Sequence, residues 1–145
     1  MIQAERWRDN WLAVSPTGAV RLDLRRSRAG RTLAKRTVGE LPPGTPVVLF
    51  ASAPGAIRRC GAFASQTGLE VEHAYLAFPS AHAPGYLVED DRAPIRFFIK
   101  TTLATPPGAA FSALIEAGLG LVRGMSPWRL LRVIAPGRIV VGRRM

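Results

Sequence analysis

The chain has 145 residues, a hydrophobic fraction of 48% and a formal net charge of +10 at pH 7. This length and composition are typical of one globular domain and exclude a disordered chain, and a lone cysteine, Cys60, excludes an internal disulfide framework. We expect a cytoplasmic protein with no signal peptide and no transmembrane segment, because positions 5, 6, 8 and 9 are charged and the most apolar run, 109–122, is too short to span a bilayer.

The first predicted elements form an N-terminal segment over residues 1–37. Apolar and polar residues alternate on both sides of a turn sequence at 15–18, which predicts a β-hairpin over residues 11–24. Residues 25–39 are basic and include a short predicted helix at 32–38.

The next three elements are predicted to form one right-handed βαβ unit over residues 46–78. Residues 46–51 are continuously apolar, which is typical of a strand that is covered on both faces. A helix is expected over residues 52–69, with Ser52 as its N-cap and Gly68 in the left-handed position that ends it. A strand follows at 70–78.

The remaining elements are a short strand at 86–88, a helix from 91 or 92 to about 105, a helix at 109–122, a short helix at 128–134 and a last strand at 138–141. The whole chain is therefore predicted to be a single α/β domain. We expect a partial Rossmann-like fold, with a mixed sheet of four to six strands and flanking helices. The expected core includes Val47, Leu49, Phe50, Ile57, Val71, Phe98 and Leu103.

Residues 38–145 resemble part of a known family. The turn and strand at 41–49 are similar to the L-x-P-G-G segment of the class I S-adenosylmethionine-dependent methyltransferases, and residues 58–72 are similar to the helix that follows it. Residues 76–80 with 86–91, and the end of the chain at 131–144, resemble later segments of that family. The resemblance implies the C-terminal half of a methyltransferase fold.

The half of the family that holds the cofactor has no counterpart in this sequence. The first 37 residues contain no G-x-G turn, and they are too few for two βα units. The resemblance therefore implies a methyltransferase-like domain that is incomplete alone, acting as an accessory or degenerate member of a biosynthetic pathway. We expect no cofactor on this chain alone; S-adenosylmethionine, and any transferase activity, would require another protein chain as partner or a homo-oligomer.

Four residues are the candidate small-molecule ligands. His73 and Tyr75 alternate on one face of the strand at 70–78, and Ser80 and His82 lie in the loop after it. Ligands of open α/β sheets gather at such strand ends. A histidine at a sheet edge or in a core can also have a purely structural role, and this alternative stays open for His73.

Three other features have a structural and a chemical interpretation. Cys60 is expected to be a small buried hydrophobe rather than a nucleophile. The acidic run at 89–91 either caps a helix or holds a cation, and capping by Asp90 or Asp91 is favoured. No metal site is expected, because the two histidines and one cysteine have no metal-ligand spacing.

The basic residues suggest an alternative function, a binding module for nucleic acid or an anionic surface. Seven of them lie close together in the sequence with one acid among them: Arg21, Arg25, Arg26, Arg28, Arg31, Lys35 and Arg36. They could neutralise phosphates, with Trp7 and Trp11 near enough in sequence for base stacking. An anionic membrane, an acidic partner chain or a merely solvated face would also account for such charge.

Overall fold

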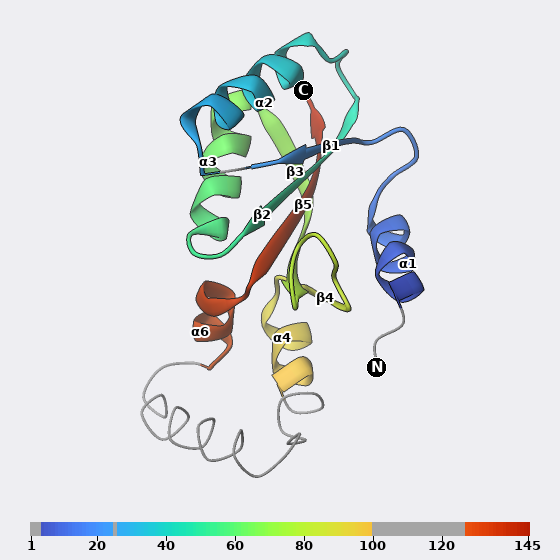
Figure 1. Ribbon diagram of the computed structural model, residues 1–145, viewed down its shortest axis with the longest axis vertical. Coiled ribbons are helices and arrows are strands. Elements are labelled where there is room, and N and C mark those ends of the chain that lie inside the picture. Colours follow the sequence, from blue (N-terminus) through green and yellow to red (C-terminus); the bar gives the residue numbers. More distant parts are fainter. Residues whose placement is uncertain (1–3, 25, 100–126) are drawn as a thin grey trace.

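The computed structural model describes residues 4–24, 26–99 and 127–145 and shows one open sheet with helices around it (Figure 1). The five strands are β1 (Val20–Asp23), β2 (Pro46–Ser52), β3 (Leu69–Phe78), β4 (Tyr86–Glu89) and β5 (Gly137–Arg144). Their order in the sheet is β1-β2-β5-β3-β4. Strands β1 and β2 are parallel, whereas β5 is antiparallel to both of its neighbours and β4 is antiparallel to β3. The predicted α/β class with a mixed sheet is confirmed.

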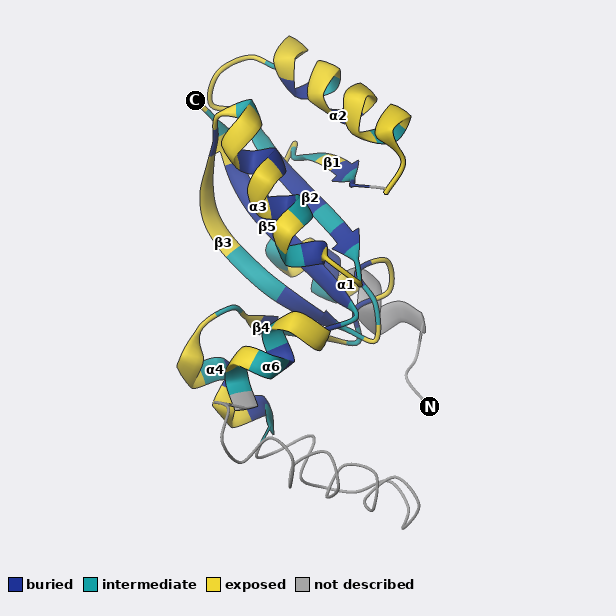
Figure 2. Cartoon of the chain, turned by 90° about the vertical axis from the view of Figure 1, so that its left-hand side faces the viewer, coloured by how far each residue is buried: buried dark blue, intermediate teal, exposed yellow. Residues whose placement is uncertain are grey.

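The described helices are α1 (Ala4–Val14), α2 (Arg28–Glu40), α3 (Ala56–Thr67), α4 (Arg92–Phe98) and α6 (Pro127–Ile134). Helices α2 and α3 lie together over one face of the sheet (Figure 2), where Val38 and Cys60 pack against Val47 and Leu49. On the opposite face, Trp11 of α1 packs against the other side of the sheet. Helices α4 and α6 share a third cluster at the end of the sheet near β4.

Strand β2 is covered on both faces, which explains its uninterrupted apolar sequence. Val47 and Leu49 face α2 and α3, whereas Val48 belongs to the cluster around Trp11. Helix α3 starts later than predicted, at Ala56, because Ser52 completes β2 and Gly55 is the N-cap with a φ of 77°. Its predicted end is confirmed, since Gly68 has a φ of 64°.

The predicted hairpin at 11–24 is wrong. Residues 11–14 belong to α1, because Trp11 and Val14 pack as one helical face against the sheet. The turn that follows includes Gly18 at a φ of 75° and leads into β1. Strand β1 then pairs in parallel with β2, and α2 forms the connection between them.

The strand, helix and strand of the predicted unit at 46–78 are present, but β5 separates β2 from β3 in the sheet. In the expected core, Val47, Leu49 and Phe98 are buried. Phe50 and Ile57 are only half-buried. Val71 is 48% exposed and lies in the part of β3, residues 70–73, that is exposed throughout and precedes the pairing with β4. Leu103 and the helix predicted at 109–122 fall outside the described residues.

Candidate anion-binding groove

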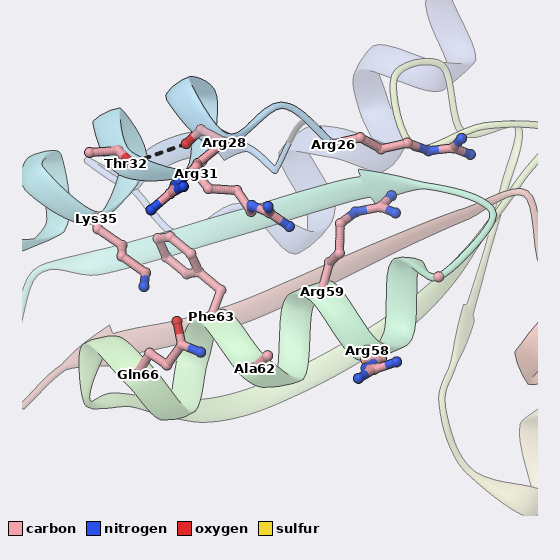
Figure 3. A pocket seen from close by; sticks show the side chains of 11 residues that line it. Arg26, Arg28, Arg31, Thr32, Lys35, Arg58, Arg59, Ala62, Phe63 and Gln66 are labelled. Atoms are coloured by element: carbon pink, nitrogen blue, oxygen red, sulfur yellow. Dashed lines mark hydrogen bonds between the residues drawn. The ribbon is translucent and has the colours of Figure 1, made fainter.

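A groove of about 750 Å³ runs between α2 and α3, the two helices that cover one face of the sheet (Figure 3). Residues of both helices and of the turns before them form its walls: Arg26, Arg28, Arg31, Thr32, Lys35, Gly55, Arg58, Arg59, Ala62, Phe63 and Gln66. Six of these side chains are cationic, and in the part of the chain that the structure describes no Asp or Glu joins them.

Helix α2 supplies the first wall because its two faces differ in composition. Ala34 and Val38 are buried against the sheet. Arg28, Arg31 and Lys35 recur at positions i, i+3 and i+7, so they share another face of the helix and line the groove. The hydroxyl of Ser27 caps the helix by accepting a hydrogen bond from the Gly30 amide, 3.2 Å away.

The turn between β2 and α3 holds one arginine from each wall. Arg26 Nη2 donates to the carbonyl of Ala53 at 2.9 Å. Arg59 donates from Nη1 to the carbonyl of Pro54 at 2.6 Å and from Nη2 to the carbonyl of Ser52. Because neutral carbonyls hold these guanidinium groups, their positions are fixed while their charges stay uncompensated.

The groove is a region of uncompensated positive charge. None of its six cations forms an ion pair with a carboxylate of residues 9–24, 26–99 or 128–145. Exposed pairs occur elsewhere, such as Arg36 with Glu40 at 3.0 Å. Several like charges around one concave surface raise the local concentration of anions. The arrangement can therefore hold an anionic ligand that makes several contacts at once.

The structure brings together four of the seven basic residues that the sequence singled out: Arg26, Arg28, Arg31 and Lys35. Arg21 instead lies over the ring of Trp11, 5.1 Å from its centroid, and Arg36 pairs with Glu40. Arg25 falls outside the described residues. The stacking role expected of Trp11 is wrong, because its side chain is 5% exposed in the core.

Arg58 and Arg59 were missed as members of this site. Sequence periodicity places them on the exposed side of α3, and it gives no sign of what lies opposite. Their position beside α2 follows from the parallel pairing of β1 with β2, which brings the two helices onto one face of the sheet. The turn at 52–55, followed by the arginine pair, was the one local feature of the sequence that could have indicated their place in the groove.

The four candidate small-molecule ligands lie outside this groove, in two separate places. His73 Nδ1 is 3.5 Å from Glu89 Oε1, and its ring centroid is 6.2 Å from that of Tyr75. Ser80 Oγ accepts a hydrogen bond from the Ala83 amide, and His82 Nε2 is 3.4 Å from Asp23 Oδ2. No interaction that the described residues make joins the two places.

The other features kept the roles that the sequence favoured. Burial raises the pKa of the Cys60 thiol from 9.0 to about 11, although Arg138 and Arg59 act in the opposite direction, so the residue is a protonated hydrophobe near neutral pH. Burial, followed by the charge of Glu89, raises the pKa of Tyr75. Asp91 is the N-cap of α4, accepting from the Arg92 amide at 2.7 Å.

Within 4–24, 26–99 and 127–145, no three His, Cys, Asp or Glu side chains come close enough together to ligate a metal. Over the same ranges, no helix has the length and apolar character needed to cross a membrane.

Comparison with known proteins gave no match: no family model, no curated protein and no solved structure is significantly similar to this chain.

Proposed function

We propose that the protein is a nucleic-acid-binding module whose groove between α2 and α3 holds the phosphate backbone. The observation that carries this proposal is the set of six cations that line one concave surface without a carboxylate partner in the described chain. Binding of this kind draws its affinity from phosphate neutralisation and the release of counterions.

The length of the groove supports a polymeric ligand over a single small anion. Arg28 and Lys35 are seven positions apart on α2, or about 10 Å at 1.5 Å per residue. One strand of a B-form helix carries about three phosphates over that distance. Several cations of the groove can thus each meet a different phosphate of one ligand.

The lining also supports backbone binding without recognition of bases. Phe63 is the aromatic residue of the groove, and it is buried at its floor. An aromatic platform for base stacking needs an exposed ring. We therefore expect little preference for base sequence and a strong dependence on salt.

The test is fluorescence anisotropy with a labelled 20-nucleotide single strand and with the corresponding duplex, over a series of salt concentrations. A triple variant, Arg28→Gln with Arg31→Gln and Lys35→Gln, removes three exposed cations of α2 that make no side-chain ion pair with described residues. We expect at least tenfold weaker binding at low salt. The slope of log K against log salt should fall in magnitude by about 2–3, since each phosphate contact contributes about 0.7–0.9.

The matched control carries the same loss of charge elsewhere: Arg92→Gln, Arg96→Gln and Arg129→Gln, all exposed on α4 and α6. It should bind nearly as the wild type does. Equal weakening in both triple variants would mean that net charge alone attracts the ligand, and it would overturn the proposal. Tight binding to phosphatidylserine vesicles, with no binding to either oligonucleotide, would show that the ligand of the groove is an anionic membrane and not nucleic acid.

A second candidate function is the methyltransferase-like one, and the order of elements along the chain supports it. The resemblance places a turn, a strand and a helix over residues 41–72, where the structure has β2 and α3, and the end of the chain, 131–144, resembles the last strand of that family. Here β5, whose sequence resembles that last strand, lies antiparallel between β2 and β3. On this proposal the chain is an accessory or degenerate half-fold, and S-adenosylmethionine binds only where a partner chain completes it.

Light scattering on protein purified from its native source at moderate salt tests this second candidate. A stable complex with another chain that binds S-adenosylmethionine in calorimetry, where the isolated chain does not, would support it. A bare monomer would count against it. Release of nucleic acid from the purified material as salt rises would favour the first proposal.

A further inference from the structure

A second, smaller pocket lies at the start of α3, separate from the groove. Its volume is about 260 Å³, and it is an open hollow bordered by α3, α6 and the beginning of β5. Most of its lining is apolar and includes Ile57, Leu76 and Val133. Three charged side chains, Arg58, Arg132 and Arg138, interrupt this apolar surface.

The charges next to this pocket do not balance. Asp90 has a side chain only 4% exposed, and it is the carboxylate shared by both arginines. Arg132 Nε lies 2.5 Å from its Oδ1, and Arg138 Nη1 lies 2.6 Å from its Oδ2. Two guanidinium groups and one carboxylate leave one positive charge without a counter-charge from the described residues. Burying such a charge is costly unless an anion compensates it.

Arg138 is the member of this cluster that most needs a further partner. Its side chain is 10% exposed, against 35% for Arg132, so it cannot turn into solvent. Its Nε has no hydrogen-bond acceptor among the residues that the structure describes. Buried donors without an acceptor are rare in folded proteins. Arg138 also lines the pocket, so an anionic group bound there would lie next to this unbalanced charge.

We propose that this pocket binds a small amphipathic anion, a carboxylate or phosphate monoester with an apolar body, whose charged group contacts Arg138. Ile57, Leu76 and Val133 bury the apolar body. At the packing density of protein interiors the volume takes about a dozen non-hydrogen atoms. The site is distinct from the nucleic-acid groove and does not depend on its function, although Gly55 and Arg58 border both hollows.

The experiment is isothermal titration calorimetry on the full chain with two probes of suitable size, benzoate and phenyl phosphate. Benzyl alcohol, acetate and inorganic phosphate serve as controls that lack either the charge or the apolar body. We expect at least one of the two aromatic anions to bind at least tenfold more tightly than all three controls. The better of the two distinguishes a carboxylate ligand from a phosphate monoester.

The variant Arg138→Met tests the contact itself. It leaves Asp90 with Arg132 as a balanced pair, so the fold should persist, and binding of the aromatic anion should weaken at least tenfold. The control Arg129→Met removes an exposed arginine of the same region and should leave binding unchanged. If Arg138→Met fails to fold, the comparison of probes on the wild type still decides the matter.

Two results would overturn the proposal: benzyl alcohol binding as tightly as the aromatic anions, or Arg129→Met weakening them as much as Arg138→Met. Failure here is distinguishable from failure of the groove. Arg138→Met should leave oligonucleotide affinity unchanged, and the α2 triple variant should leave benzoate and phenyl phosphate affinity unchanged.

Discussion

Asp90→Asn is the substitution with the most clearly defined cost. The change keeps the shape of the side chain and removes the negative charge that lies between Arg132 and Arg138, at 2.5 and 2.6 Å. Removing one partner of a buried ion pair costs about 3–5 kcal/mol of unfolding free energy. Arg132 is 35% exposed and can turn toward water, so most of the cost arises at Arg138, which is 10% exposed.

We therefore expect Asp90→Asn to lose about 3–4 kcal/mol, within the range for a buried pair. For a chain of this size that corresponds to a fall in Tm of about 10 °C. Urea denaturation followed by far-ultraviolet circular dichroism measures the free energy by linear extrapolation.

The double variant Asp90→Asn with Arg138→Met is the internal control. It removes the buried charge that has lost its partner, so it should recover at least half of the stability that Asp90→Asn loses. A loss below about 1 kcal/mol in the single variant would refute the reasoning, because typical exposed pairs contribute no more than that. A double variant no more stable than the single one would refute it as well.

Three further predictions concern single positions. Gly137→Ala should destabilise the fold by about 2–3 kcal/mol, because a Cβ there would lie 2.3 Å from the Ala81 amide nitrogen. Gly39→Ala in α2 meets nothing within 4 Å and should stabilise the fold by up to about 1 kcal/mol. Equal shifts of Tm in the two variants on thermal unfolding would contradict this prediction. The raised pKa of Cys60 gives a stability contribution that is complete below pH 9.0 and is lost as pH rises to about 11. Between those pH values the unfolding free energy measured by urea denaturation should therefore fall less in Cys60→Ala than in the wild type, by up to about 3 kcal/mol. Asp91→Ala should cost about 1 kcal/mol through the lost cap of α4, and an unchanged Tm would show that the cap contributes nothing.

Local patterns predicted most of the strands and the C-terminal end of α3 because their causes are local. The apolar run at 46–51 is buried on both faces wherever the strand sits in a covered sheet, and Gly68 ends a helix through its own φ. The hairpin prediction failed because residues 11–14 are too few to distinguish alternation from a helical face. Packing of Trp11 on the sheet decided in favour of the helix.

The position of β5 could not be predicted from local patterns. Its apolar sequence predicts a strand, but its place between β2 and β3 depends on pairings with residues about 70 and 90 positions away. The candidate sites share this limit. The α2 wall of the groove was visible as a run of charge, whereas Arg59 and the cluster of Asp90 with Arg132 and Arg138 exist only once distant segments pack together.

Nuclear magnetic resonance titration of isotope-labelled protein with a single-stranded oligonucleotide shows directly whether the groove between α2 and α3 binds nucleic acid, because it locates the contact. We expect chemical-shift changes concentrated on α2 and α3, at residues 28–35 and 58–66, that disappear as salt is raised. Changes concentrated on α4 and β4 instead, with the α2 and α3 signals unmoved, would contradict this expectation.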